Sequence, residues 1–360
     1  MADKLKDRLN REFLENFASV ARSVRADFPE ERFVSLALDG DWERLELKQR
    51  FSRLAEVLRE TLPGDYREAL DVLNRLAPVC SGFEYLFFPA FVERYGLDDW
   101  EASLPALEWL TRFSSAEFAV RPFIVRDTER MMAQMLRWAE HENEHVRRLA
   151  SEGCRPRLPW AMALNGLKRD PSPVLPILER LKRDPSLYVR RSVANNLNDI
   201  AKDHPELVKE LAVRWSGQHP DTDWILRHGC RTLFRHGDEE ALSLFGYESA
   251  DDVRVSRLRL SAEEARIGGS LTFECEIANG SDKPQKLRVA YGIDFVKSGG
   301  KLSRKWFKLA DKPFAPGATV LSRSHSFRNL STRKHYPGPH RLVIAVNGDE
   351  KAAAEFLLRE

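Results

Sequence analysis

The sequence lacks the patterns that define several large classes of protein. Its 360 residues include four cysteines (Cys80, Cys154, Cys230 and Cys275) and no CxxC pair, so neither a disulfide framework nor a zinc site is indicated. No apolar run approaches the ~18 residues of a membrane-spanning helix, and the opening MADKLKDRLN lacks the apolar segment of a signal peptide. We therefore expect a cytoplasmic protein without a membrane partner.

Motifs for common chemistries are missing as well. The chain contains no GxxxxGK[ST], GxGxxG or GxSxG motif, so nothing supports nucleotide hydrolysis, dinucleotide binding or a serine-hydrolase mechanism. Six histidines lie without HExxH or CxxC…HxxxH spacing at His141, His145, His204, His219, His228 and His236. We expect no metal and no organic cofactor.

The formal net charge of +2 hides a gradient along the chain. Residues 1–110 hold 15 Lys and Arg against 22 Asp and Glu, residues 111–250 hold 22 against 20, and residues 251–360 hold 20 against 13. Between Lys297 and Arg341 there are eleven basic residues and one acid, Asp311. Positive charge that rises towards the C-terminus favours a polyanionic partner, although a solvated basic surface would have the same composition.

The sequence predicts a multidomain α plus β protein. Residues 1–250 have apolar positions at helical spacing, with acidic N-terminal helices in 1–110 and repeats in 111–250. In the repeats Val146 matches Val189 at a spacing of 43, and Val189 matches Ile225 at a spacing of 36. Helix pairs at this period are typical of HEAT-like α-solenoids, so we expect one here.

Residues 251–360 change to a period of two. Segments such as SLTFECEIAN and QKLRVAYGIDF alternate apolar and polar residues and are separated by NGSDKP, KSGG, APGA and YPGP. About seven short strands of this kind predict an immunoglobulin-like β-sandwich, without the Cys…Trp…Cys framework of antibody domains. Its basic residues gather in KSGGKLSRKWFK and FRNLSTRKHYPG, where loops of such a domain are expected to bind.

The repeats also bring arginines into register. By the alignment, Arg148, Arg191 and Arg227 occupy one equivalent position, and Glu152, Asn195 and Arg231 occupy the next position, one helical turn on. Guanidinium groups pair well with phosphates. We interpret the series as an arginine ladder that binds DNA phosphates; the alternative is an ordinary solvated helix face.

One carboxylate stands out within the basic segment HVRRLASEGCRPRLPW. Glu152 precedes Gly153 and is expected to end a helix, where an acid opposes the helix dipole. A functional role is one reading, and an ion pair with Arg148 is the other. Asp199 lies on the same face one repeat along, and a pair with Lys202 is its alternative.

Two further candidates have structural alternatives. Glu117 ends the motif SSAE, which can form a capping box with Ser114 as N-cap. Trp160 follows Pro159, a residue suited to the first position of a helix, so Trp160 is expected in a first turn, where it would stack on a sugar or base or pack in the core.

Four segments together resemble a known family. EFAVRPFI, HVRRLASEGCRPRLPWA, VRRSVANNLNDIAKDHP and HGCRTL are similar to the AlkC branch of the AlkC/AlkD-like DNA alkylation repair glycosylases, and a C-terminal immunoglobulin-like domain is typical of one AlkC subset. The resemblance implies a HEAT-like solenoid that grips duplex DNA on its concave face. It also implies an immunoglobulin-like domain that approaches the DNA from the other side, near the minor groove.

The resemblance further implies an activity and its residues. The activity is hydrolysis of the N-glycosidic bond of 3-methyladenine and 3-methylcytosine without turning the base out of the duplex. By position, the catalytic carboxylates are Glu117, Glu152 and Asp199, and the substrate-binding aromatic residue is Trp160. Because the alkylated base is already cationic, it leaves without a general acid, while the carboxylates stabilise the oxocarbenium character of the sugar.

We also expect a monofunctional enzyme, since no lysine stands out as a Schiff-base nucleophile. The expected partner is duplex DNA with alkylated bases, and the expected form is a monomer in the bacterial cytoplasm. The expected DNA-binding residues are Arg121, Arg148, Arg155, Arg157, Arg190, Arg191, Asn195, Arg227, Arg231, Lys301, Arg304, Lys305, Arg333 and Lys334. The alternative function is a non-catalytic helical-repeat scaffold that binds DNA or protein; a metal-dependent nuclease is a third possibility that the ligand spacing disfavours.

Overall fold

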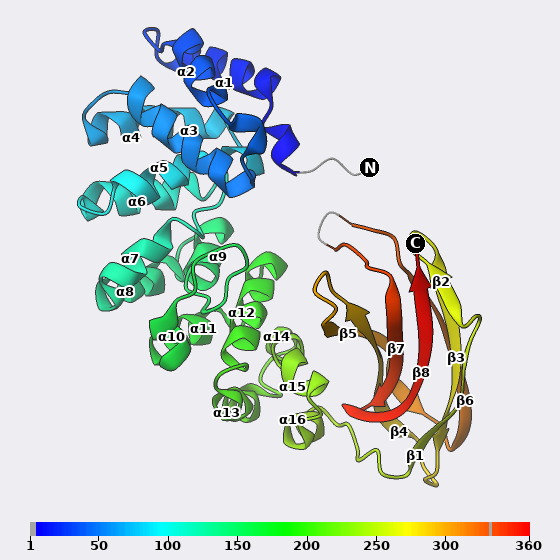
Figure 1. The fold of residues 1–360 in the computed structure, drawn as a ribbon. Coiled ribbons are helices and arrows are strands. Elements are labelled where there is room, and N and C mark those ends of the chain that lie inside the picture. The colour runs from blue at the N-terminus through cyan, green and yellow to red at the C-terminus, as the bar shows by residue number, and fades with distance from the viewer. Residues whose placement is uncertain (1–4, 331–332) are drawn as a thin grey trace. The chain divides into compact units, whose positions relative to one another are not determined.

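The computed structural model describes residues 5–330 and 333–360 (Figure 1). The chain forms two compact units. The first runs to His204 and includes Ser216–Gly229, and the second comprises Pro205–Trp215 and Cys230–Glu360. Within the described residues, no helix combines the length and the apolar character needed to cross a membrane.

The first unit begins with six α-helices. They are α1 (Arg11–Val24), α2 (Glu30–Leu38), α3 (Leu47–Thr61), α4 (Tyr66–Leu76), α5 (Phe87–Tyr95) and α6 (Trp100–Leu110), with short 3-10 turns between them. Side-chain caps begin α1, α4 and α6, where Asn10, Asp65 and Asp99 each accept from a backbone N–H of the first turn. Pro89 lies within the apolar sequence of α5 and does not interrupt the helix. It lies in the first turn of α5, where a helix does not need the missing N–H.

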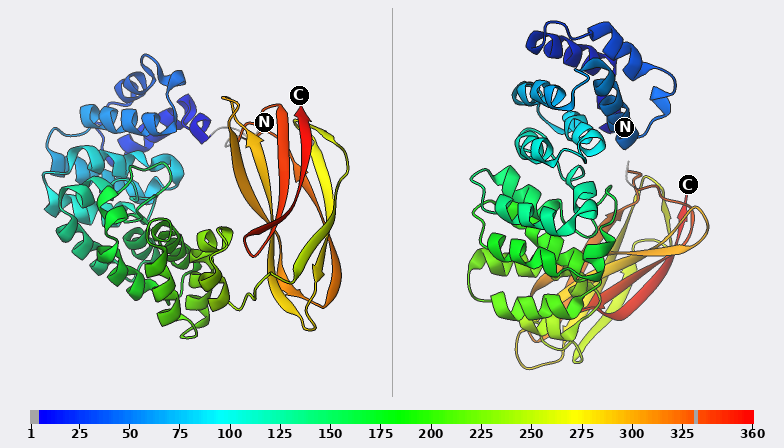
Figure 2. Two further views of the ribbon diagram at one scale, coloured as in Figure 1. Left: turned by 60° about the horizontal axis from the view of Figure 1, so that its bottom comes forward. Right: turned by 90° about the vertical axis from the view of Figure 1, so that its left-hand side faces the viewer.

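The repeats follow as α7 (Val120–Arg126), α8 (Thr128–Trp138), α9 (Glu144–Glu152), α10 (Asn165–Arg169), α11 (Leu175–Leu181), α12 (Leu187–Ile200) and α14 (Pro220–Gly229). Figure 2 shows these helices stacked one after another along the first unit. Helix α12 packs against both α9 and α14. The matched residues Val146, Val189 and Ile225 are all fully buried, so the repeat alignment identifies the apolar stripe that holds the stack together.

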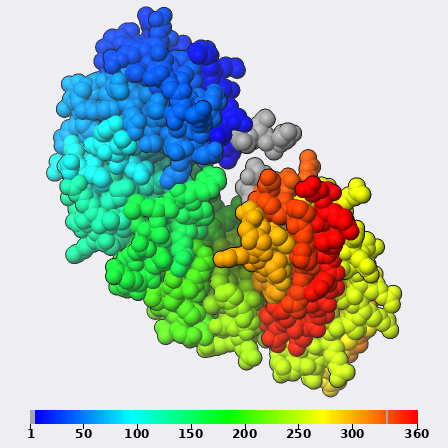
Figure 3. Space-filling model, in the orientation of Figure 1, coloured from blue at the N-terminus to red at the C-terminus, as the bar shows by residue number. Residues whose placement is uncertain are grey.

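The second unit contains an eight-stranded sandwich among the described residues. Its strands are β1 (Val253–Leu260), β2 (Glu264–Arg266), β3 (Ser270–Asn279), β4 (Gln285–Val296), β5 (Leu302–Phe314), β6 (Gly317–Ser326), β7 (Gly338–Val346) and β8 (Asp349–Arg359). One sheet has the order β1-β3-β6 and the other β2-β8-β7-β4-β5. The antiparallel strands β7 and β8 lie side by side on the face of this unit seen in Figure 3. A helical repeat-like region followed by an immunoglobulin-like sandwich is thus confirmed.

Three helices belong to the second unit: α13 (Pro205–Trp215), α15 (Arg231–Arg235) and α16 (Glu239–Leu244). Lys209 of α13 donates to Glu240 of α16 at 2.6 Å, and Lys286 of β4 donates to the Phe245 carbonyl at 2.6 Å. The last helix ends at Leu244 and the first strand begins at Val253. The division by packing therefore differs from the predicted boundary at residue 250. Helices α13 and α15 both pack on α16, and Arg288 of β4 lies over the ring of Phe234 in α15 at 5.6 Å.

The sandwich also buries three histidines. His325, His335 and His340 lie among the aromatic rings of its core, and His325 shares a hydrogen bond of 3.1 Å with the Tyr291 hydroxyl. Burial, followed by the nearby Arg333 guanidinium, lowers the pKa of His325 from 6.5 to about 4. Burial likewise lowers the pKa of His335 and His340.

These histidines predict that acid destabilises the sandwich. Between pH 6.5 and about 4, His325 is protonated in the unfolded chain but remains neutral in the folded chain. The free energy of unfolding is therefore highest above pH 6.5 and decreases as the pH falls through this range. His325→Asn should flatten this dependence. Thermal unfolding of the full chain from about pH 7.5 to about pH 4.5 measures it; a variant with the same pH profile as the unaltered chain would contradict the expectation.

Candidate active site

Three acidic side chains from separate parts of the first unit are joined by two arginines into one series of ion pairs. The series runs Glu117, Arg148, Glu152, Arg155, Asp199, and we call it the carboxylate–arginine chain. Arg148 pairs with Glu117 and lies 3.5 Å from Oε1 of Glu152. Arg155 donates to Oε1 of Glu152 at 2.6 Å and to Oδ2 of Asp199 at 3.0 Å. The three carboxylates expected to be catalytic therefore lie together.

Glu117 is held in a turn ahead of α7. Its Oε2 accepts from the Ser115 hydroxyl at 2.8 Å, and that hydroxyl in turn accepts from Arg148 at 3.0 Å. The capping box that the sequence offered as the alternative role of Glu117 is absent: α7 begins at Val120, and the Ser114 hydroxyl has no hydrogen-bond partner among the described residues. Glu117 is consequently free of a helix-capping duty and faces Arg148.

Glu152 is the last residue of α9, as expected. The next residue, Gly153, allows the end of α9 to approach α7 closely, because a Cβ there would meet Val120 Cγ2 at 2.5 Å and the Leu149 carbonyl at 3.0 Å. Asn196 of α12 donates from Nδ2 to the Ser151 carbonyl at 2.8 Å. These contacts fix the helix end that carries Glu152 between its two neighbouring helices.

The structure contradicts the prediction that Arg121 binds DNA. Its side chain is 0% exposed and donates to the carbonyls of Gly153 at 2.9 Å, Arg155 at 2.9 Å and Met162 at 2.8 Å. Burial lowers the pKa of Arg121 to about 10, which leaves it charged at neutral pH. Arg121 holds residues 153–162 against α7, and its buried guanidinium has no surface for a phosphate.

Asp199 lies on α12 with its side chain only 2% exposed. Oδ2 accepts from Arg155 at 3.0 Å and Oδ1 accepts from Lys202 at 3.0 Å, so both oxygens are engaged. The pair with Lys202 that the sequence offered as the alternative therefore exists beside the contact with Arg155. Asp199 anchors one end of the carboxylate–arginine chain.

Glu117 and Glu152 each have one carboxylate oxygen that accepts no hydrogen bond from the described residues. Among the described residues, no group donates a hydrogen bond to Oε1 of Glu117 or to Oε2 of Glu152. Burial opposes the charges of Arg148 and Arg155, but the adjoining carboxylates outweigh it and raise the pKa of both guanidiniums. The site thus combines two arginines that stay positively charged with two carboxylate oxygens that remain available to a water molecule or a sugar.

Trp160 lies in the loop between α9 and α10 and is 58% exposed. Its φ of 64° is the left-handed conformation that non-glycine residues rarely adopt. Lys48 of α3 holds the loop by donating to the Trp160 carbonyl at 2.8 Å. The prediction of a helix beginning at Pro159 is wrong, since α10 starts at Asn165; the exposed indole in a strained, anchored turn suits a contact surface.

The arginine ladder divides into two kinds of residue. Arg148 is half-buried and paired with Glu117, whereas Arg191 and Arg227 are exposed, and Asn195 is half-buried. Arg155 is buried in the carboxylate–arginine chain, where its guanidinium donates to Glu152 and Asp199. Arg191 and Arg227 therefore retain the access to solvent that a phosphate contact requires, while Arg148 and Arg155 position carboxylates.

The remaining helical candidates are held by other contacts. Arg157 forms a bidentate pair with Asp203, at 3.0 Å and 2.6 Å. Arg190 lies 3.2 Å from Asp221 and donates to the Asp184 carbonyl at 2.8 Å. Both pairs link successive repeats, so a DNA phosphate would have to share or displace an acidic partner at each of them.

The predicted DNA-binding residues of the second unit also differ in how exposed they are and in whether they already have a partner. Lys301 and Lys334 are exposed, and Arg231 and Lys305 are half-buried. Arg304 makes a bidentate pair with Asp294, at 2.6 Å and 2.8 Å. Arg333 lies over the rings of Phe295 and Phe307 at 5.5 Å and 5.6 Å. The segment FRNLSTRKHYPG also contains Ser331 and Thr332, which lie outside the described residues.

Several contributors to the site were missed from the sequence. Tyr188 stacks under the Arg148 guanidinium at 5.1 Å, Ser115 bridges Arg148 to Glu117, and Lys48 anchors the Trp160 loop. Tyr188 directly precedes the matched Val189, so the repeat alignment offered a signal for it. Nothing local marked Ser115 or Lys48. No cluster of three or more His, Cys, Asp or Glu suited to a metal occurs in residues 5–330 and 333–360.

Comparisons with known proteins agree with this architecture. A family model described as DNA alkylation repair enzyme matches residues 99–233, and one described as uncharacterised protein YhaZ, C-terminal Ig-like domain, matches residues 254–360. The chain is 49% identical over 357 residues to the uncharacterized protein YhaZ of Bacillus subtilis, with 99% of both chains covered.

A solved structure extends the match to three dimensions. Pseudomonas fluorescens alkylpurine DNA glycosylase AlkC, bound to DNA containing an abasic site analog, is 42% identical to this chain. The alignment covers 99% of this chain and 100% of that one, with a TM-score of 0.93. The resemblance seen in the sequence is confirmed: the chain belongs to the AlkC-type DNA alkylation repair enzymes that carry a C-terminal immunoglobulin-like domain.

Proposed function

We propose that the chain is a monofunctional DNA glycosylase that releases cationic N-alkylated bases, 3-methyladenine and 3-methylcytosine, from duplex DNA. The observation that carries the proposal is the carboxylate–arginine chain, which brings Glu117, Glu152 and Asp199 together from three separate elements. Membership of the AlkC-type enzymes and the likeness to a DNA-bound alkylpurine glycosylase support it.

The chemistry requires little more than fixed negative charge. Alkylation at N3 makes the base a cation that departs as a neutral molecule, and the bond that breaks leaves positive charge on C1′ of the deoxyribose. A carboxylate held nearby stabilises that charge, and a carboxylate oxygen that accepts a proton from water directs its attack on C1′. Water adds its oxygen to the sugar, so the product is an abasic site with an intact strand.

The hydrogen bonds suggest a division of work among the carboxylates. Glu117 and Glu152 each keep an oxygen that no described residue occupies, so we assign them the contact with the sugar or its water. Both oxygens of Asp199 are engaged by Arg155 and Lys202, so Asp199 acts as a positioning residue for Arg155 and thereby for Glu152. The base stays within the duplex in this scheme, and Trp160 packs against the sugar or base at the lesion.

DNA binding is assigned to the exposed members of the ladder. Arg191→Gln should weaken affinity for duplexes of any sequence and reduce the slope of log affinity against log salt by about 0.9, the amount for one phosphate contact. Arg137→Gln on α8, where Arg137 is exposed and donates to Gln134, is the control. Fluorescence anisotropy across a salt series measures both; equal slopes for the two variants would remove Arg191 from the interface.

One assay separates this function from its alternatives. Duplex DNA with 3-methyladenine is incubated with the protein and EDTA, and free base and strand breaks are measured separately. The proposal expects released base, abasic sites and no nicking. Binding without release would indicate the non-catalytic scaffold, and strand cleavage that EDTA abolishes would indicate a nuclease. We propose that the enzyme acts as a monomer in the bacterial cytoplasm.

A further inference from the structure

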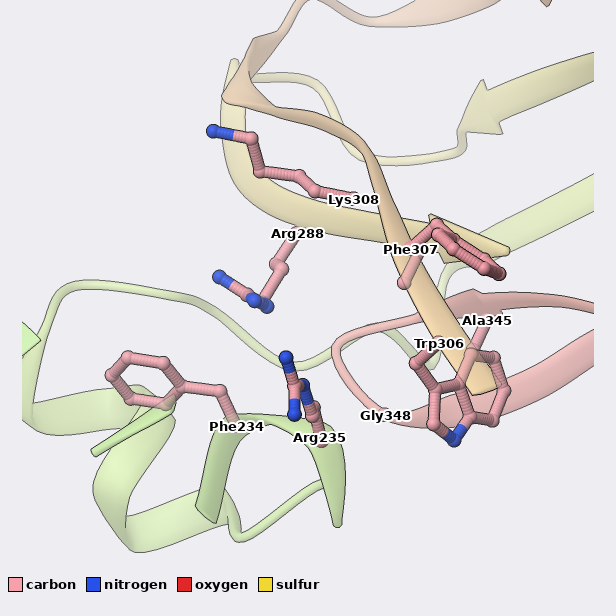
Figure 4. Close-up of a pocket in the computed structure, with 9 residues that line it drawn as sticks. Phe234, Arg235, Arg288, Trp306, Phe307, Lys308, Ala345 and Gly348 are labelled. Carbon is pink, nitrogen blue, oxygen red and sulfur yellow. The ribbon is translucent and has the colours of Figure 1, made fainter. Parts of the chain in front are cut away.

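The second unit contains a small cavity that the proposed chemistry does not use. It lies between α15, strands β4 and β5, and the β7–β8 turn, with a volume of about 80 Å³ (Figure 4). Its polar and aromatic lining is formed chiefly by Phe234, Arg235, Arg288, Trp306 and Lys308. That volume holds a few water molecules and is too small for a nucleobase.

The lining is positive and contains no acid. The guanidinium groups of Arg235 and Arg288 point toward each other in Figure 4, while the Lys308 ammonium extends away from them. The Arg235 side chain makes no hydrogen bond or ion pair with any residue of the described chain. Burial against the sandwich, and then the charge of Arg288, lowers the pKa of Arg235 although part of its side chain is exposed.

Of the two arginines, only Arg288 has an acidic partner near the cavity, and that partner is Asp311. Oδ2 of Asp311 lies 3.5 Å from Nη1 of Arg288, and Oδ1 accepts from the Tyr247 hydroxyl at 2.8 Å. Asp311 is outside the cavity lining. Two guanidiniums therefore face each other across the cavity, and only one of them has an acidic partner. Their like charges repel, so the two side chains would move apart if nothing held them in place.

The backbone holds the two arginines in place. At the end of α15, Gly237 (φ 70°) packs directly on Gly348 (φ 94°) of the β7–β8 turn, and a Cβ on Gly348 would collide with the Gly237 backbone. In the same turn, Oδ1 of Asn347 accepts from the Arg288 N–H at 2.8 Å, and Nδ2 donates to the Glu248 carbonyl at 2.7 Å. Helix α15 is thereby fastened to β4, which keeps Arg235 opposite Arg288.

We propose that Arg235 and Arg288 form a binding site for one phosphoryl group. A guanidinium fork matches the oxygens of a phosphate, and a bound anion would remove the repulsion between the two arginines. The cavity volume fits a single tetrahedral anion. A phosphodiester of the DNA strand is the source we favour, a choice that rests on the proposed glycosylase function; free inorganic phosphate has the same chemistry and would occupy the same site.

The test uses the full-length chain and the variants Arg235→Gln, Arg235→Lys and, as a matched control, Arg254→Gln. Arg254 is an exposed arginine of β1, in the other sheet of the sandwich. The unfolding temperature is measured in inorganic phosphate and in chloride of equal ionic strength. Affinity for an undamaged duplex is measured across a salt series. Base release is measured separately, so a failure of the glycosylase proposal is visible on its own.

We expect phosphate to raise the unfolding temperature of the unaltered chain, of Arg254→Gln and of Arg235→Lys by more than that of Arg235→Gln, which should show only the general stabilisation that phosphate gives to folded proteins. If the source is DNA, Arg235→Gln also loses about 0.9 from the salt slope; loss of the phosphate response with an unchanged slope assigns the site to free phosphate. If Arg235→Gln matches the unaltered chain in both measurements, no phosphoryl site exists and the proposal is overturned, whatever the base-release assay gives.

Discussion

Glu152→Gln is expected to slow base release by about 100-fold or more while the affinity for duplex DNA stays nearly unchanged. The substitution keeps the shape of the side chain and removes the negative charge that faces the developing cation. Glu152 has an oxygen that no described residue occupies, and it is the only carboxylate that contacts both arginines of the carboxylate–arginine chain within the described residues. Single-turnover release from a 3-methyladenine duplex measures the effect.

The variant should remain folded, which makes the result interpretable. Arg148 keeps its pair with Glu117, and Arg155 keeps its pair with Asp199, so neither guanidinium is left without a carboxylate. Glu129→Gln, at an exposed position in the first turn of α8, is the matched control and should release base at the normal rate. An unchanged rate for Glu152→Gln would leave the proposed mechanism without its main residue.

Arg121→Ala is expected to destabilise the first unit by about 3 kcal/mol or more. The side chain is fully buried, and its removal leaves the carbonyls of Gly153, Arg155 and Met162 without their donors and opens a cavity between α7 and the loop that joins α9 to α10. Because the same loop carries Trp160, activity should fall with stability. Thermal and urea unfolding measure the change.

Arg121→Lys distinguishes a structural role from a DNA contact. Lysine retains the charge but lacks the planar fork that reaches three carbonyls at once, so this variant should also unfold more easily. If Arg121 were instead a phosphate contact, Arg121→Lys would keep most of the affinity and all of the stability. Normal stability in both Arg121 variants would contradict the assigned role.

Periodicity predicted the parts of this molecule that repeat. The match of Val146, Val189 and Ile225 located three buried positions of the helical stack, and alternation located the longer strands of the sandwich. Strand β2 has only three residues, which is too short for an alternation of apolar and polar residues to be recognised in the sequence. It pairs in parallel with β8, which is distant in the sequence. The helices α13, α15 and α16 have the same local pattern as the others, so their packing with the sandwich was not predictable from it.

The candidate site was predictable in its residue types and only partly in its contacts. The segments that hold Glu117, Glu152 and Asp199 were identified together, yet the links between them depend on Arg155 reaching Asp199, 44 residues away. Arg121 gives no local sign of its burial, because its partners are carbonyls of a loop that begins 32 residues later. Contacts of this kind are set by tertiary packing, which a single sequence does not display.

The central claim is that fixed carboxylates stabilise a sugar cation formed when an already cationic base departs. The most direct test compares two duplexes that differ at one base, 3-methyladenine and its neutral analogue 3-deaza-3-methyladenine, with EDTA present. The account predicts that both duplexes bind and that only the cationic base is released. Release of the neutral base at a similar rate would contradict it, since the protein would then be supplying a proton to the leaving group.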